Sequence, residues 1–215
     1  IKCLNPRPAE AFDNSVMQPV IPDVIMKHKE NSGWIIELNS ETLPRVLVNN
    51  TYFATISSAT KSKEDKRYIN DCYQSANWLV KSLHQRATTI LKVASEIVRQ
   101  QDAFFARGIQ YLRPLVLRDI ADAIDMHEST VSRVTSNKYI SSPRGIFELK
   151  YFFTAAISSS SGGETYSSES VRHRIKALVD GEAIDKILSD DKIVSILNSE
   201  GIDVARRTVA KYREA

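Results

Sequence analysis

Residues 117–136 read LRDIADAIDMHESTVSRVTS, and this stretch decides the fold. Its apolar spacing predicts two short helices, with Ile120 buried in the first and Val131 buried in the second. Asp125 stands at the turn between them, where aspartate tolerates the left-handed backbone better than most residues. The stretch matches a helix-turn-helix, whose second helix commonly enters the major groove of DNA, although such pairs also occur with a purely structural role.

The second helix of this unit is the first predicted DNA contact. It offers several hydroxyls and one arginine, which suit hydrogen bonds to phosphates and to base edges. The histidine at the turn has no neighbours at metal-ligand spacing. The residues predicted to contact DNA here are His127, Glu128, Ser129, Thr130, Ser132, Arg133 and Ser136.

The end of the chain carries the second predicted DNA contact. We expect Ala205–Glu214 to form a short helix with Asp203 as its N-cap, with Val204, Thr208 and Tyr212 on one apolar face and Val209 beside them. Basic side chains project from the other faces, although a solvated terminal helix would look similar. The residues predicted to contact DNA here are Ala205, Arg206, Arg207, Thr208, Lys211, Tyr212 and Arg213.

The basic residues of this terminal helix are predicted to have two roles. An arginine can donate two hydrogen bonds to a guanine edge, so Arg206 and Arg207 are the candidates for reading sequence. Lys211 and Arg213 are expected to hold the helix in the groove through phosphates.

The segment before the helix-turn-helix has a helical pattern of unusual length. From residue 63 to residue 107, apolar positions alternate three and four apart without Gly or Pro, and Gly108 closes the pattern. This predicts one very long helix or two abutting helices. Further along, Tyr139–Phe153 contains a turn at Ser142–Gly145 followed by an apolar helix or strand.

The two ends of the chain are predicted to differ in structure. Short strands are expected at Val24–Lys29, Trp34–Leu38 and Arg45–Val48, in a lobe that contacts protein or is purely structural. A serine-rich stretch predicts a flexible linker that lets the last domain move. Beyond it we expect a helix at Ser168–Val179 and another capped by Asp190 or Asp191, which complete a three-helix domain with the terminal helix.

The charge and cysteine content narrow the function classes. The net charge of +3 is too small to diagnose DNA binding, but residues 61–110 carry nine basic and five acidic groups. The lobe at 1–60 carries five and six, which argues against a DNA surface there. Two cysteines form no disulfide framework, which fits a reducing cytoplasm, and no signal peptide or membrane span is visible. No metal or cofactor site is predicted.

These patterns together predict a mainly α, elongated, multi-domain chain with a few short strands in the N-terminal lobe. The predicted divisions are a lobe at 1–60, a long helix at 61–110, a helix-turn-helix domain at 111–157, a flexible linker at 158–168 and a C-terminal three-helix DNA-binding domain at 169–215.

Several motifs resemble the enhancer-dependent bacterial sigma factors, the sigma-54 (RpoN) family. Ala205–Glu214 resembles the signature box of that family at every position. Leu4–Pro8 resembles a motif of its core-binding region, with Ala9 where the family usually has Gly. Further resemblances, in the expected order, lie at Gln74–Leu79, Met126–Arg133 and Ser142–Phe153.

The resemblance implies a sigma factor that directs core RNA polymerase to double-stranded promoter DNA. The family's terminal box reads an upstream GG element, and its helix-turn-helix and long helix lie by a downstream GC element. The closed complex melts only when an AAA+ activator ATPase acts on an N-terminal region. We expect this chain to be a cytoplasmic, nucleoid-associated fragment that lacks that region and begins in the latter part of the core-binding domain.

Three other functions fit parts of the sequence. A two-domain helix-turn-helix repressor would bind DNA without polymerase. A scaffold that binds only protein would not need the basic terminal helix. An enzyme is disfavoured, because the four histidines are scattered, the cysteines are unpaired and no phosphate-binding loop is present.

Overall fold

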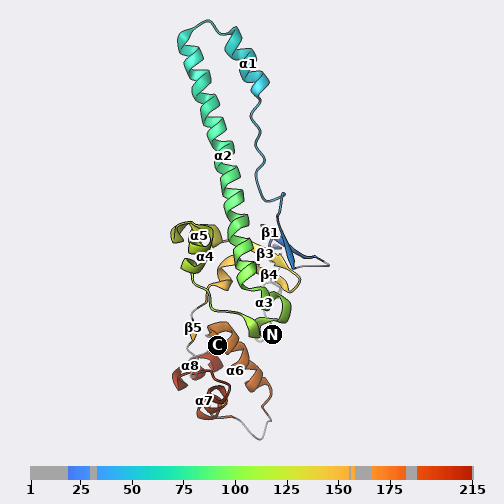
Figure 1. Cartoon of the computed structure of the whole chain (residues 1–215), viewed down its shortest axis with the longest axis vertical. Helices are drawn as coiled ribbons and strands as arrows, with labels where there is room; N and C mark the ends of the chain where they lie inside the picture. Colours follow the sequence, from blue (N-terminus) through green and yellow to red (C-terminus); the bar gives the residue numbers. More distant parts are fainter. Residues whose placement is uncertain (1–18, 30–32, 155, 158–165, 183–187, 215) are drawn as a thin grey trace, which may run out of the picture.

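The chain is elongated and mainly helical, with a long helical segment as its shaft (Figure 1). This computed structural model describes residues 19–214 apart from 30–32, 155, 158–165 and 183–187. The mainly α, multi-domain fold predicted from the sequence is confirmed.

The shaft consists of two abutting helices, as the apolar spacing allowed. Helix α2 (Lys63–Gln100) has 38 residues, and α3 (Asp102–Arg107) follows after a single residue. At 1.5 Å per residue α2 is about 57 Å long. Its buried residues all lie between Thr89 and Val98, so its first half projects beyond the body of the protein.

The projecting half of α2 is accompanied by a second helix that the sequence did not predict. Helix α1 (Asn50–Ala59) lies against it, with the rings of Phe53 and Tyr73 stacked 3.9 Å apart. The Asn49 side chain accepts a hydrogen bond from the third residue of α1 and so starts the helix. The strand predicted at Arg45–Val48 is wrong, because this segment has no neighbouring strand and leads directly into α1.

The helix-turn-helix has the structure that the sequence predicted. Helix α4 (Leu117–Ile124) and helix α5 (Glu128–Thr135) are joined by a turn in which Asp125 has φ 54° and ψ 54°. Ile120 and Val131 are both fully buried. A 3₁₀ helix, η2 (Ile109–Tyr111), lies between α3 and this unit.

A four-stranded sheet joins the N-terminal segment to the helix-turn-helix. Its strands are β1 (Val24–His28), β2 (Trp34–Leu38), β3 (Tyr139–Ser142) and β4 (Gly145–Glu148), in the order β2-β1-β3-β4. β1 runs parallel to β3 and the other pairs are antiparallel. The expectation that the strands are confined to an N-terminal lobe is therefore wrong, since β3 and β4 follow the helix-turn-helix in sequence.

A polar contact at the start of the two central strands adds to the pairing of β1 with β3. The carboxylate of Asp23 accepts hydrogen bonds from Lys138 Nζ at 2.8 Å and from the Tyr139 backbone N–H at 3.1 Å. The sequence predicts a helix or a strand after the turn at Ser142–Gly145. The structure has both there, because β4 is followed by a 3₁₀ helix, η3 (Leu149–Phe152).

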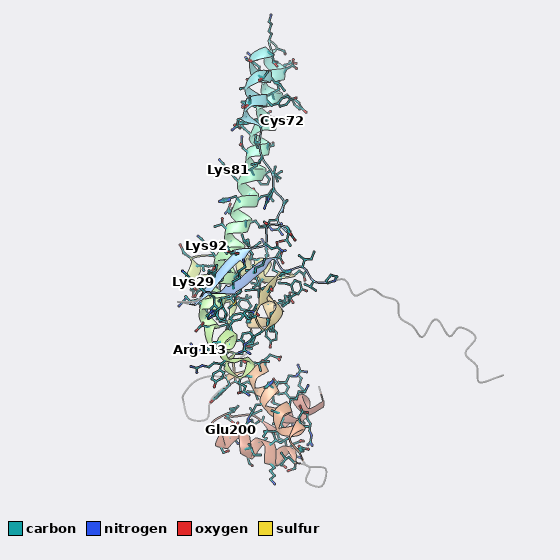
Figure 2. All side chains as sticks on the ribbon, turned by 90° about the vertical axis from the view of Figure 1, so that its right-hand side faces the viewer. Lys29, Cys72, Lys81, Lys92, Arg113 and Glu200 are labelled. Carbon is teal, nitrogen blue, oxygen red and sulfur yellow. The ribbon has the colours of Figure 1, made fainter. Side chains whose placement is uncertain are left out.

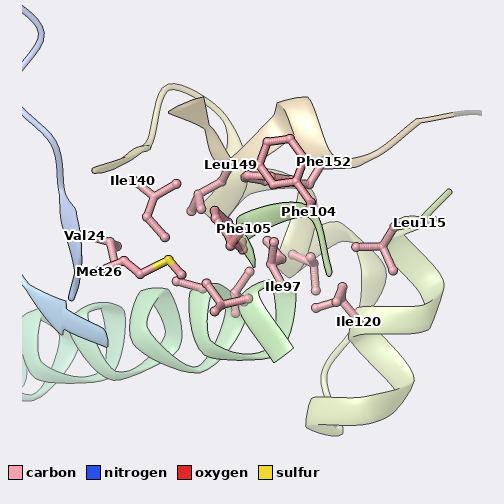
Figure 3. Close-up of a cluster of buried hydrophobic side chains, with 14 of the residues drawn as sticks. Val24, Met26, Ile97, Phe104, Phe105, Leu115, Ile120, Ile140, Leu149 and Phe152 are labelled. Atoms are coloured by element: carbon pink, nitrogen blue, oxygen red, sulfur yellow. The ribbon is translucent and has the colours of Figure 1, made fainter. Parts of the chain in front are cut away.

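One hydrophobic core holds the sheet, the shaft and the helix-turn-helix together (Figure 3). Val24 of β1, Ile97 of α2, Ile120 of α4 and Phe152 of η3 are all fully buried in it. Phe104 contributes an aromatic ring 5.5 Å from that of Phe152.

The last part of the chain forms a separate three-helix core. Its helices are α6 (Ser168–Asp180), α7 (Asp190–Ser199) and α8 (Arg206–Glu214), preceded by a ribbon of β5 (Ala156–Ile157) and β6 (Tyr166–Ser167). Most of the predicted linker, 158–165, lies outside the described residues, but its last three residues belong to β6 and α6. The cap of α7 is Ser189 rather than either aspartate.

Candidate nucleic-acid interface

The terminal helix α8 is oriented by a short turn and by a buried valine. Gly201 has φ 85°, a conformation that favours glycine, and the next residue donates its N–H to the Leu197 carbonyl at 2.9 Å. The Ala205 carbonyl accepts the first helical hydrogen bond, from Thr208 N–H at 2.9 Å. The helix therefore begins at Arg206, two residues later than a cap at Asp203 would require.

The outward face of α8 carries two basic residues one turn apart. Val209 is fully buried, so the helix presents its opposite side to solvent. Arg207 and Lys211 lie on that side and are exposed. Within the described part of the chain neither forms a hydrogen bond or an ion pair, and both are available to a ligand.

Arg206 lies at the side of this face and has a partner. Its Nη1 is 3.4 Å from the Asp191 carboxylate, and both side chains are 67% exposed. An ion pair this exposed contributes little to stability, so a phosphate or a guanine can replace Asp191. Ala205 is also exposed, beside the first turn of the helix.

The predicted role of Arg213 does not agree with its position in the domain. Its Nη1 donates to the Leu188 carbonyl at 3.0 Å and to the Asp190 carboxylate at 3.2 Å, and its Nη2 lies 3.5 Å from Glu182. Only 28% of its side chain is exposed. Arg213 therefore ties the end of α8 to the start of α7. Its acidic partners are far away in sequence, and no local pattern pointed to them.

The two remaining residues of this set are partly buried. Thr208 lies beside the buried stripe, and the ring of Tyr212 packs against the core of the three-helix domain. Thr208 and Tyr212 therefore lie on the inward face with Val209 at its centre, whereas Val204 is buried but precedes the helix.

The second candidate surface is the exposed side of α5. His127 caps this helix, since its Nδ1 accepts the Ser129 backbone N–H at 3.2 Å. Ser136 at the other end donates to the Ser132 carbonyl at 2.9 Å. Glu128, Ser129, Arg133 and Ser136 are exposed, whereas Thr130 and Ser132 are half-buried.

Further basic residues lie on the shaft beside this surface. Lys81 and Lys92, labelled in Figure 2, line a groove between α2 and the turn of the helix-turn-helix. His84 lines the same groove, which ends at Asp125 and Met126. A negatively charged backbone lying against α5 would pass close to these cations.

Ionisable groups in and beside the C-terminal domain have shifted pKa values. A hydrogen bond from Arg174 holds the pKa of Glu200 below its usual range. Burial raises the pKa of Tyr151, and the negative charge of Glu169 raises it further.

The described residues contain no group of three or more His, Cys, Asp and Glu side chains that could hold a metal ion. No helix in the described part of the chain is long and apolar enough to cross a membrane.

Comparisons with known proteins show the family of the chain. A family model described as "Sigma-54, DNA binding domain" matches residues 66–215, and one described as "Sigma-54 factor, core binding domain" matches residues 1–52. Two proteins named RNA polymerase sigma-54 factor, from Azorhizobium caulinodans and Caulobacter vibrioides, are each 60% identical over the whole chain. The chain spans 42% and 44% of their respective lengths.

A solved structure is similar as well. A crystal structure of Aquifex aeolicus sigmaN bound to promoter DNA matches with a TM-score of 0.61 and 32% identity. The match covers 93% of this chain and 58% of that one.

Proposed function

This chain belongs to the sigma-54 family, and on that premise we propose that it recognises a promoter at two places, with α8 on an upstream GG element and α5 on a downstream GC element. The observation that carries the proposal is the outward face of α8. A buried valine on one side leaves Arg207 and Lys211 exposed and unpaired, among the described residues, on the other. Arginine is the residue best suited to guanine in the major groove.

The contacts of the basic residues of α8 support a different division of roles among them. Arg207 is the first candidate for the guanine contact, because Arg206 must first leave Asp191. Lys211 lies on the same face and suits a phosphate. Arg213 positions the helix and is not assigned to DNA.

The test is the affinity of single-site variants for two duplexes. Arg207→Ala should cost about 1–3 kcal/mol on a GG site and less on a scrambled one. Lys27→Ala, which removes an exposed charge from β1, is the control for lost net charge. If Arg207→Ala loses the same binding free energy on both duplexes, Arg207 contacts a phosphate and does not read the GG element.

The assignment of α5 is tested in the same way. Its candidate contacts are Ser129, Thr130, Ser132 and Arg133, with Lys81 and Lys92 against the neighbouring phosphates. The unaltered chain should bind a promoter duplex in which only the GC element is mutated more weakly than the intact promoter. On that mutated duplex, Arg133→Ala should have nearly the same affinity as the unaltered chain. An unchanged affinity of the unaltered chain would contradict the assignment.

The function of the full protein also involves core RNA polymerase. The match of residues 1–52 to a core binding domain supports this part of the proposal. We propose that the full protein forms a closed complex in the bacterial cytoplasm, and that an AAA+ activator ATPase acts on a region outside this chain. Footprinting on a GG/GC promoter with core polymerase alone, with the factor alone and with both together tests this. A repressor would protect the promoter equally well without polymerase.

A further inference from the structure

An acidic side chain lies beside the end of α8 that is expected to enter the groove. Helix α7 packs against α8 in the C-terminal domain (Figure 1), and Asp191 in the first turn of α7 faces Arg206, the first residue of α8. The Asp191 carboxylate lies 3.4 Å from Arg206 Nη1, and 67% of each side chain is exposed. Both groups therefore reach solvent at the N-terminal end of the recognition helix, which is the end that contacts base edges in a helix-turn-helix.

The packing of the domain does not require Asp191. Its neighbour Asp190 points inward, where it accepts a hydrogen bond from Arg213 at 3.2 Å and is only 24% exposed. Asp190 also supplies the acidic residue that stabilises the first turn of a helix, and Ser189 already caps α7. Among the residues that the structure describes, the Asp191 carboxylate has an ion pair or hydrogen bond with Arg206 alone. Asp191 is thus available to a ligand together with Arg206.

A carboxylate at this place limits which DNA sequence can lie against it. Phosphates repel it, and most polar atoms on the base edges of the major groove are acceptors, as a carboxylate is. The exceptions are the amino groups N4 of cytosine and N6 of adenine, which donate hydrogen bonds. Asp191 therefore makes a favourable contact in the groove only where it meets one of these amino groups.

A G·C base pair offers a partner to each of the two side chains. Guanine presents the acceptors O6 and N7 to an arginine, and the paired cytosine presents its N4–H to a carboxylate. O6 and N4 are hydrogen-bonded to each other within the base pair, so they lie about 2.9 Å apart. The distance of 3.4 Å between Arg206 Nη1 and the Asp191 carboxylate is similar. The two side chains can thus exchange their contact with each other for one contact each to the same base pair.

We propose that Asp191 is a specificity-determining residue, which accepts a hydrogen bond from the N4 amino group of a cytosine opposite the GG element while Arg206 donates to the guanine of the same base pair. Arg207 is left for the other guanine. The inference rests on the proposed function, because it assumes that α8 reads this element. It gives the complementary CC strand a reader that no cation of α8 can supply, since lysine and arginine have no acceptor.

A different role for Asp191, as a competitor that holds Arg206 away from DNA, predicts the opposite result. Removing a competitor releases Arg206 on every sequence, so affinity rises on a GG duplex at least as much as on a scrambled one. Removing a reader lowers affinity on the GG duplex, because cytosine N4 loses its acceptor. It raises affinity on the scrambled duplex, because a carboxylate no longer faces acceptors and phosphates. The sign of the change on the GG duplex therefore distinguishes the two roles.

The first test measures the affinity of the whole chain for a GG duplex and for a scrambled duplex at one salt concentration. Asp191→Ala should bind the GG duplex about fivefold more weakly and the scrambled duplex about twofold more tightly. Asp191→Asn keeps an acceptor oxygen and should bind the GG duplex within about twofold of the unaltered chain. Tighter binding of Asp191→Ala to the GG duplex overturns the proposal.

Asp203→Ala is the matched control for the lost negative charge. Asp203 is an exposed carboxylate just before α8, and it has no polar partner in the part of the chain that the structure describes. Its removal should change the affinity for both duplexes by the same factor. If Asp191→Ala also changes both affinities by one common factor, Asp191 acts only through its charge and the proposal is wrong.

The second test removes the amino group itself. Each cytosine opposite the GG element is replaced in turn by 2-pyrimidinone, which has hydrogen in place of the N4 amino group. The weaker base pair affects every protein alike, so the measured quantity is the difference between the unaltered chain and Asp191→Ala. At one of the two positions the unaltered chain should lose about fivefold more affinity than Asp191→Ala. Equal losses in the two proteins at both positions mean that Asp191 at most orients Arg206, and they overturn the contact to cytosine.

The same measurements separate failure of this inference from failure of the proposed function. If the unaltered chain binds the GG duplex no better than the scrambled one, the proposed function fails and reading by Asp191 fails with it. If the chain prefers the GG duplex and Arg207→Ala reduces that preference, but Asp191→Ala leaves it unchanged, only the assignment of Asp191 fails.

Discussion

Replacing Arg213 by Met should loosen the C-terminal domain without removing a DNA contact. The substitution keeps an unbranched side chain of similar length and deletes the guanidinium. The Leu188 carbonyl then loses a donor at 3.0 Å, and the Asp190 carboxylate loses one at 3.2 Å. Glu182, only 10% exposed, loses the cation that lies 3.5 Å away.

The magnitude follows from how deeply these groups are buried. Hydrogen bonds to charged groups contribute about 1.5–3 kcal/mol, and breaking a fully buried ion pair costs about 3–5 kcal/mol. Asp190 is 24% exposed, so water can replace part of what it loses. We therefore expect a cost of about 2 kcal/mol in the local opening of α7 and α8.

Hydrogen exchange measures this cost, because a chain with several cores does not unfold in a single step. Amides of α7 and α8 should exchange roughly 30-fold faster in Arg213→Met, while those of α5 stay unchanged. In Arg213→Met, the slope of log DNA affinity against log salt concentration should be unchanged. Lys211→Met, the comparison variant, should reduce that slope by about 0.9 and leave exchange unchanged.

The opposite pattern would refute this reasoning. If Arg213→Met lowers the salt slope as much as Lys211→Met and leaves exchange in α7 and α8 unchanged, Arg213 contacts a phosphate. The original expectation from the sequence would then hold.

Three further perturbations test the structure. Phe152→Ala empties a fully buried position and should cost about 3–5 kcal/mol by hydrogen exchange in the main core, whereas Tyr68→Ala, on a side chain that is 71% exposed, should cost less than about 0.5. Gly108→Ala forces a side chain to φ 117°, with its Cβ 3.4 Å from an arginine nitrogen, and should cost about 1–3 kcal/mol in the opening of α3 and η2. Because Arg174 lowers the pKa of Glu200 from 4.5, their pair stabilises the fold fully above that value and is lost as pH falls through the lower folded pKa. Acid titration followed by exchange in α7 should therefore show an extra loss that Arg174→Gln removes, and identical titrations of the two proteins would contradict the pair.

The helix-turn-helix and the long shaft could be predicted because their signals are local. Alternating spacings of three and four residues indicate a helix whatever it packs against. Asp125 marked the turn because few residues adopt its backbone conformation, and it has that conformation in the structure. The break after Gln100 divides the shaft into the two abutting helices that the spacing also permitted.

The predictions that failed depended on partners distant in sequence. Arg45–Val48 has the composition of a strand, but a strand forms only where another strand offers hydrogen bonds, and here the chain leads into the cap of α1. The sequence predicts the two strands of the N-terminal hairpin, but it does not predict which other strand the hairpin pairs with. The hairpin pairs with β3 more than a hundred residues later, through Asp23 and Lys138.

The sequence by itself determined the long helices, the helix-turn-helix and the residue types offered to DNA, because helical periodicity and turn chemistry act over a few neighbouring residues; α1 is the helix it did not predict. It could not give the surroundings of each cation of α8. Arg206, Arg207 and Arg213 are the same residue type, yet one meets Asp191, one is exposed and one is enclosed by Asp190 and Glu182. Only tertiary structure decided this, since the charge and burial around a side chain come from segments that folding brings to it.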